Sequence, residues 1–154
     1  MNTTTTNHTP TLRFYKPNGR GSGSAIEFKF FPATTTTEGA LHIRIAPQDT
    51  NNDIMKFDFD NAYVFKLRFE DVCRVLQVIR GETESVNDYG GKAITDVFGK
   101  EFHFRHCVEG VCFYEFRIKS DHTGYDVRFE MNNAQALGLC VVLEDCLPKM
   151  AFGV

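Results

Sequence analysis

The sequence predicts an α+β protein made of two four-stranded antiparallel β-sheets, each followed by a helix. Three observations predict this fold class. Polar and apolar residues alternate with a period of two in short segments, as in strands with one buried face. The period becomes helical once in the middle of the chain and once near its end. The 154 residues include 15 Phe and 5 Tyr, and aromatic side chains favour strands.

The first half of the chain is predicted to form four strands and a helix. The expected strands cover residues 11–16, 24–32, 40–47 and 54–61. Over residues 68–81 the spacing becomes helical, with Gly81 as a natural stop and acidic residues in the first turn. The apolar positions of this helix are Phe69, Val72, Cys73, Leu76 and Ile79.

The second half is predicted to repeat the same order of elements. Its expected strands cover residues 92–99, 101–107, 112–119 and 125–131, and a closing helix covers 133–150. Asn132 or Asn133 is the expected helix cap. Because this helix is apolar nearly all round, we expect it to be buried. The repeats, 11–82 and 92–151, form one domain over residues 11–154, after a Thr-rich leader at 1–10 that we expect to be disordered.

Composition restricts the function classes. The net charge of −3 argues against a duplex-DNA binder that depends on phosphate contacts alone, although a near-neutral protein can still carry a basic face. The five cysteines include no C-x-x-C pair, and no segment reads as a membrane span or a signal peptide. These features predict a cytoplasmic protein, in a bacterial or phage-infected cell, without metal or cofactor.

The segment EFHFRHCVEGVCFYEF, residues 101–116, places two histidines and two cysteines close together. A three-residue loop pairs residue 107 with 111 and sets apolar side chains beside apolar ones, whereas pairing 107 with 112 sets Phe beside Arg and Glu. The first register puts His106 and Cys112 on the inner face, and His103, Arg105 and Cys107 on the outer one. Ligands on opposite faces cannot converge on one ion, so we predict a hairpin rather than a metal site.

Outward-facing basic and aromatic residues make the sheets candidates for binding single-stranded nucleic acid. Such binding needs cations for the phosphates and aromatic rings for the bases. The predicted contact residues are Arg13, Tyr15, Lys16, Arg20, Lys29, Phe31, His42, Arg44, Lys56, His103, Arg105, Phe113, Arg117 and Lys119. The Gly-rich run KPNGRGSGSA joins two strands and opens no helix, so we expect a flexible hairpin loop near the binding edge. No catalytic motif is present, and we predict that the chain is not an enzyme.

Three segments resemble the Whirly family of single-stranded DNA-binding proteins, whose fold mitochondrial guide-RNA-binding proteins share. Residues 57–72 are similar to the family's run at its fourth strand and helix start, through Phe57-Asp58-Phe59, Phe65, Leu67, Asp71 and Val72. GALHIRIAPQ resembles its strand ending in Phe-Ala-Pro, and Leu147-Pro148 with Met150 and Gly153 resembles its closing motif. The family's Lys-Gly-Lys-Ala-Ala-Leu run is replaced by Gly21-Ser22-Gly23-Ser24-Ala25-Ile26, which lacks the lysines.

The resemblance implies two roughly orthogonal sheets, a tetramer, and a nucleic-acid strand along the sheet edges and neighbouring protomers. It favours a single-stranded DNA-binding protein with little sequence specificity that serves replication, recombination or repair. Two alternatives stay open: a single-stranded RNA binder, and a protein–protein assembly module of the same fold.

Overall fold

The computed structural model describes residues 10–49, 56–88, 91–107 and 113–153, so nearly all of the predicted leader lies outside the described residues. The first sheet has the order β1 (Thr11–Lys16), β2 (Ser24–Phe31), β3 (Ala40–Asp49) and β5 (Tyr63–Leu67), and the short β4 (Lys56–Phe57) pairs with the far end of β3. The second contains β6 (Ile94–Thr95), β7 (Lys100–Cys107), β8 (Phe113–Ser120) and β9 (Asp126–Met131) in sequence order. The helices α1 (Phe69–Ile79) and α2 (Asn133–Phe152) follow the first and second sheets, which confirms the predicted fold class.

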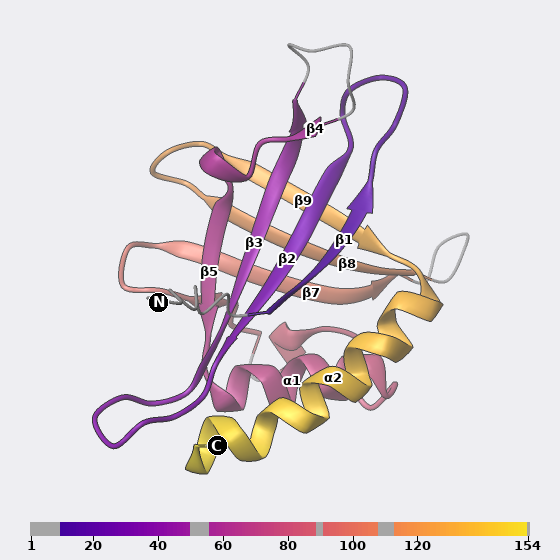
Figure 1. Cartoon of the computed structure of the whole chain (residues 1–154). Coiled ribbons are helices and arrows are strands. Elements are labelled where there is room, and N and C mark those ends of the chain that lie inside the picture. Colours follow the sequence, from indigo (N-terminus) through magenta and orange to yellow (C-terminus); the bar gives the residue numbers. More distant parts are fainter. Residues whose placement is uncertain (1–9, 50–55, 89–90, 108–112, 154) are drawn as a thin grey trace, which may run out of the picture.

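The two sheets lie face to face with their strands crossing at a steep angle, and both helices lie at one end of the pair (Figure 1). Alternation along the strands sends one face of each sheet inward. Phe28 of β2 meets Phe116 of β8 with ring centroids 5.6 Å apart, and Phe65 of β5 meets Phe102 of β7 at 5.5 Å. The core between the sheets is therefore largely aromatic, and the polar side chains of each sheet face outward.

The predicted strand over residues 54–61 is confirmed only at Lys56 and Phe57, which pair with β3. Residues 54 and 55 lie outside the described residues, β4 ends at Phe57, and a 3₁₀ helix (η1, Phe59–Asn61) follows. The Asp58 carboxylate accepts a hydrogen bond from the Asn61 amide at 3.3 Å, which turns the chain out of the strand direction. The alternation of Phe and Asp therefore belongs to a turn, and β5 is the fourth long strand of this sheet.

The predicted strand over residues 92–99 is shorter than expected, because only Ile94 and Thr95 pair with β7. The Asp96 carboxylate accepts hydrogen bonds from the backbone amides of Phe98 and Lys100, both at 2.9 Å. Gly99 completes this turn at φ +81°, a left-handed conformation that glycine adopts without strain. A rigid turn thus replaces the second half of the expected strand.

The β7–β8 hairpin has the predicted faces but not the predicted register. Cys107 pairs with Phe113, and His106 with Tyr114, so the register is two residues from the expected pairing of 107 with 111. A shift of two residues preserves the side of every side chain. His106 accordingly lies on the inner face, half-buried with its ring 4.9 Å from Tyr114, while Cys107 is on the outer face but buried. Cys112 lies outside the described residues.

The expected burial of the closing helix is correct for one side only, and its predicted cap at Asn132 is confirmed. The Asn132 side chain accepts from the Gln135 amide at 2.8 Å. Because α2 packs at one end of the sheets, only its core-facing side is covered. Leu137, Val141 and Val142 are 69%, 61% and 42% exposed. We call these three residues the α2 stripe.

The apolar positions predicted for α1 are correct in part. Val72 and Leu76 are buried, Cys73 and Ile79 are partly buried, and Phe69 at the first turn is exposed. The buried set also includes Val75 and Val78, so the helix packs through a broader face than the predicted spacing gives. Gly81 lies just past the helix end at φ +78°, as expected for a stop residue.

The Gly-rich loop between β1 and β2 is hydrogen-bonded to the end of β3. The buried Gln48 side chain of β3 accepts from the backbone amides of Asn18 and Gly23, each at 3.1 Å, and donates to the Asn18 carbonyl at 3.2 Å. A Cβ atom on Gly23 would lie 2.2 Å from the Lys16 carbonyl oxygen, so only glycine fits there. Glycine therefore serves close packing at this position of the loop.

Candidate nucleic-acid interface

The outer face of the first sheet carries many of the predicted contact residues. In one part of this face the positive charges are paired with a buried carboxylate and covered by an aromatic ring. Glu27 of β2 is only 2% exposed, and its carboxylate accepts from Arg13 Nε at 2.7 Å and Arg44 Nη1 at 3.2 Å. The Phe59 ring of η1 lies over this cluster, 4.1 Å from the Arg13 guanidinium carbon. Arg44 also donates to the Phe59 carbonyl. Both arginines therefore have an internal partner.

Tyr15, another predicted contact, lies beside the same cover. Its ring is 5.6 Å from that of Phe57 in β4. It remains half-exposed, so one side of the ring is open to solvent. The segment 56–61 therefore folds across the outer face and removes much of it from the predicted contact surface.

The open part of this face is a row of three basic side chains on adjacent strands. Lys29 of β2 pairs with His42 of β3, and His42 pairs with Lys66 of β5. Side chains at directly opposed positions lie on the same face within about 4.5–5.5 Å at their Cβ atoms. Among the residues that the structure describes, no ion pair neutralises either lysine. We call Lys29, His42 and Lys66 the basic row.

An aromatic ring adjoins the basic row. Phe31, two residues along β2 from Lys29, has its ring centroid 4.6 Å from that of His42. The Lys29 ammonium lies 5.4 Å from the centre of the same phenylalanine ring. Phe31 is partly exposed. The row therefore combines free positive charge with a stacking surface, the two elements that single-strand binding requires.

The charge state of His42 follows from its place in the row. Burial lowers its pKa below the ordinary value of 6.5, and the positive charges of Lys66 and Lys29 lower it further. At neutral pH the imidazole is therefore uncharged and offers one donor and one acceptor. The lysines supply the row's charge, and His42 supplies a flat ring and hydrogen bonds.

The outer face of the second sheet also carries predicted contacts, but its charges are balanced. Ion pairs join Arg105 to Glu115 at 3.3 Å, Arg117 to Asp126 at 2.8 Å and Lys119 to Glu101 at 3.4 Å. The hydrogen bond from Arg117 lowers the pKa of the Asp126 carboxyl, which thus stays ionised through the neutral range. These cations already have partners, so phosphate would have to compete with carboxylates here.

His103 and Phe113 have different surroundings on this second face. His103 is half-buried, its Nδ1 lies 3.1 Å from Asn87 Nδ2, and burial lowers its pKa. Phe113 is partly buried, with the Lys16 ammonium 5.9 Å from the centre of its ring. Lys16 itself pairs with Glu130 at 3.0 Å. His103, Phe113 and Lys16 therefore each already have a partner within the protein.

The remaining predicted contacts, Arg20 and Lys56, are exposed and lie away from the basic row. Arg20 is in the β1–β2 loop, and Lys56 begins β4. The structure therefore brings Lys29, Phe31 and His42 together on an open surface, whereas most of the other predicted cations are paired with carboxylates. Lys66 was missed, although its place between the buried Phe65 and Leu67 shows by alternation that it faces outward.

Two further kinds of site were sought among the described residues. They contain no group of three or more His, Cys, Asp or Glu side chains placed to hold a metal ion. No helix in the described part of the chain is long and apolar enough to cross a membrane.

Comparison with solved structures identifies proteins of similar fold. WHY3 from Arabidopsis thaliana has a TM-score of 0.64 at 16% identity, over 94% of this chain and 89% of that one. WHY1 from the same plant gives 0.63 at 16% identity, over 93% and 85%. The chain has a Whirly-like fold. A guide-RNA-binding protein complex solved with its RNA gives 0.66 at 14% identity, over 92% of both chains. No family model and no curated protein matches the sequence. The Whirly-like fold predicted from the three short segments is thus confirmed.

Proposed function

We propose that this chain binds single-stranded nucleic acid, with single-stranded DNA as its main ligand, on the outer face of the first sheet. The observation that carries the proposal is the basic row, whose Lys29 and Lys66 have no carboxylate partner among the described residues. Phe31 lies beside Lys29 and His42 of this row. Phosphates would contact the lysines while a base stacks on Phe31. Such contacts recognise a backbone and a ring, so little sequence preference is expected.

The structural neighbours support the same class of ligand. One of them is described as a guide-RNA-binding protein complex bound to its RNA, and it covers the fold over nearly its whole length. This neighbour gives the RNA alternative a specific basis. Neither lysine of the row distinguishes DNA from RNA, because both sugars carry the same phosphate.

Fluorescence anisotropy tests the proposal. Labelled oligo(dT) and oligo(rU) of equal length would be titrated at low and at high salt, with a duplex as a third ligand. We expect salt-sensitive binding of the single strands, tighter for oligo(dT), and weaker binding of the duplex. No binding of either single strand at low salt would refute the function, and tighter binding of oligo(rU) would favour the RNA alternative.

We further propose that the protein is a homo-oligomer, with a tetramer as the state that the family resemblance implies. The α2 stripe exposes three large apolar side chains on one helix. Val142 of this stripe, Cys146 of α2 and Phe30 of β2 line an apolar groove of about 220 Å³. A continuous apolar area of this kind is typical of a contact between copies.

Size-exclusion chromatography with light scattering tests the assembly. We expect a mass several times that of one 17.5 kDa chain. Val141→Glu places a charge in the stripe and should lower the mass, whereas Glu144→Gln on the same helix should leave it unchanged. A monomeric wild-type protein would refute the assembly.

A further inference from the structure

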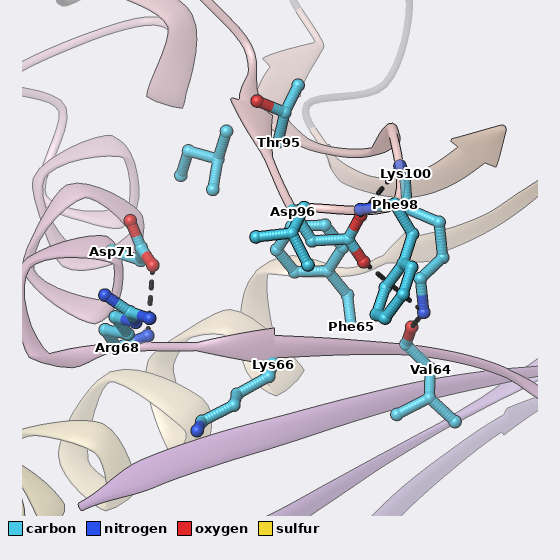
Figure 2. Close-up of a pocket in the computed structure, with 11 residues that line it drawn as sticks. Val64, Phe65, Lys66, Arg68, Asp71, Thr95, Asp96, Phe98 and Lys100 are labelled. Carbon is cyan, nitrogen blue, oxygen red and sulfur yellow. Dashed lines mark hydrogen bonds and ion pairs between the residues drawn. The ribbon is translucent and has the colours of Figure 1, made fainter. Parts of the chain in front are cut away.

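A groove at the edge of the first sheet has a role that the basic row does not explain. It has a volume of about 610 Å³ and runs between β5 and the β6–β7 turn. Figure 2 shows Arg68 and Asp71 at one end of the groove, and Phe98 and Lys100 at the other. Val64 and Lys66 line it from β5. Lys66 thus belongs both to the basic row and to the lining of the groove.

The turn holds an aromatic side chain in the open. Phe98 is 76% exposed, although an exposed ring of this size has a large apolar surface in contact with water. Its backbone is fixed, because the Asp96 carboxylate accepts from the Phe98 amide at 2.9 Å and the Asp96 carbonyl accepts from the Gly99 amide at 3.2 Å. A ring presented from a rigid turn loses little conformational freedom when a ligand stacks on it.

The position of the turn relative to β5 is also fixed. The Lys100 ammonium donates to the Val64 carbonyl of β5 at 2.7 Å, and so ties the turn to the sheet edge. In Figure 2 the Phe98 side chain reaches from the turn towards β5 beside Lys100. The bond also uses an edge carbonyl, which reduces the capacity of this part of β5 to pair with another strand.

The charges around the groove favour an anionic ligand. Lys66 and Arg68 are exposed, and no ion pair to either is found among the described residues. Of the carboxylates that line the groove, Asp96 binds the turn amides and lies 3.6 Å from Lys100, and Asp71 accepts from the Arg68 backbone amide at 3.0 Å. The acids are therefore held in structural bonds, while Lys66 and Arg68 keep their charge for a ligand.

From this arrangement we infer that the groove is a nucleobase site, in which one base of a bound single strand stacks on Phe98 and its flanking phosphates lie at Lys66 and Arg68. The inference rests on the proposed function and extends it. Because Lys66 belongs to both surfaces, the strand would continue from the basic row over the β5 edge into the groove. Each of the four bases has a flat π-face that can stack on a phenylalanine ring, so the site would accept any base.

Two measurements on the full chain test this site. The first is the affinity for labelled oligo(dT) at low salt, for which Phe98→Ala should weaken binding by about 5- to 150-fold, as for the loss of one stacking surface. Phe98→Tyr should retain wild-type affinity because it keeps an aromatic ring. Phe98→Leu should bind nearly as weakly as Phe98→Ala, because leucine has apolar bulk but no ring on which a base can stack. Phe152→Ala is the matched control, since Phe152 is 91% exposed on the last turn of α2 and has no place in the groove.

The second measurement is photocrosslinking with an oligo(dT) that carries 5-iodouracil, followed by mass spectrometry of the peptides. We expect the crosslink at Phe98. Wild-type affinity for Phe98→Ala, or a crosslink that never includes the turn, would overturn the groove site and leave the proposed function intact. Failure of the wild-type protein to bind would overturn both. A change of mass in light scattering for Phe98→Ala without oligonucleotide would also overturn the site, because it would assign the ring to a contact between copies.

Discussion

The basic row makes a quantitative prediction about salt. Each phosphate contact on a single strand contributes about 0.7 to the slope of log affinity against log salt. Lys29 and Lys66 have no acidic partner among the described residues, and the lowered pKa of His42 leaves that ring uncharged at neutral pH. The double variant Lys29→Ala/Lys66→Ala should therefore reduce the slope by about 1.4. The loss of affinity between 50 and 200 mM salt should become about sevenfold smaller.

Anisotropy titrations of labelled oligo(dT) at four or five salt concentrations would measure the slope. Lys149→Ala is the control, because Lys149 lies on α2 and pairs with Asp145 at 2.9 Å. Lys119→Ala examines the second sheet, where the lysine is paired with Glu101. The reasoning is refuted if the double variant keeps the wild-type slope, and a reduced slope for Lys119→Ala alone would place the phosphates on the second sheet instead.

Three predictions concern stability and pH. Glu27→Ala leaves two half-exposed arginines without their buried partner and should lower the free energy of unfolding by about 1–3 kcal/mol, as measured by urea denaturation. A value near zero would show that the cluster contributes little. Phe116→Ala empties the centre of the aromatic core and should cost about 3–5 kcal/mol in the same assay, so a loss below 1 kcal/mol would contradict the packing. His42 and His103 have folded-state pKa values below 6.5, so the unfolded chain binds more protons as the pH falls through 6.5. Stability should decrease between pH 7 and 5.5, by at most about 1.4 kcal/mol per histidine and pH unit, and His42→Gln/His103→Gln should flatten this dependence.

The sequence predicted the strands that are recognised from the alternation of polar and apolar residues within one segment. Alternation along β2, β3, β7 and β8 depends on one buried face, and each of these strands has one. The same alternation occurs at Phe57 and Phe59, where it has another cause. These rings pack over the outside of the first sheet rather than into the core. A period of two cannot tell these two surfaces apart.

Features that depend on contacts between residues far apart in the chain could not be predicted from the sequence. The exposure of Val141 follows from where α2 packs, and a helix that is apolar on all sides gives no indication of which side that is. The ion pair between Arg117 and Asp126 removes a cation that alternation alone offered as a contact. Phe98 could have been suspected from its Asp-x-x-Gly turn, but its place beside β5 requires the tertiary fold.

The loop between β1 and β2 should behave as a part of β3 during local unfolding. The amides of Asn18 and Gly23 donate to the Gln48 side chain, so exchange of their hydrogens with solvent requires the end of β3 to open. A glycine-rich surface loop would ordinarily exchange within the shortest labelling times. Here these two amides should exchange as slowly as the Gln48 amide, which donates to the Gly23 carbonyl at 2.9 Å. Hydrogen exchange at these two loop amides would therefore measure how often the end of β3 opens, although the composition of the loop alone would predict rapid exchange.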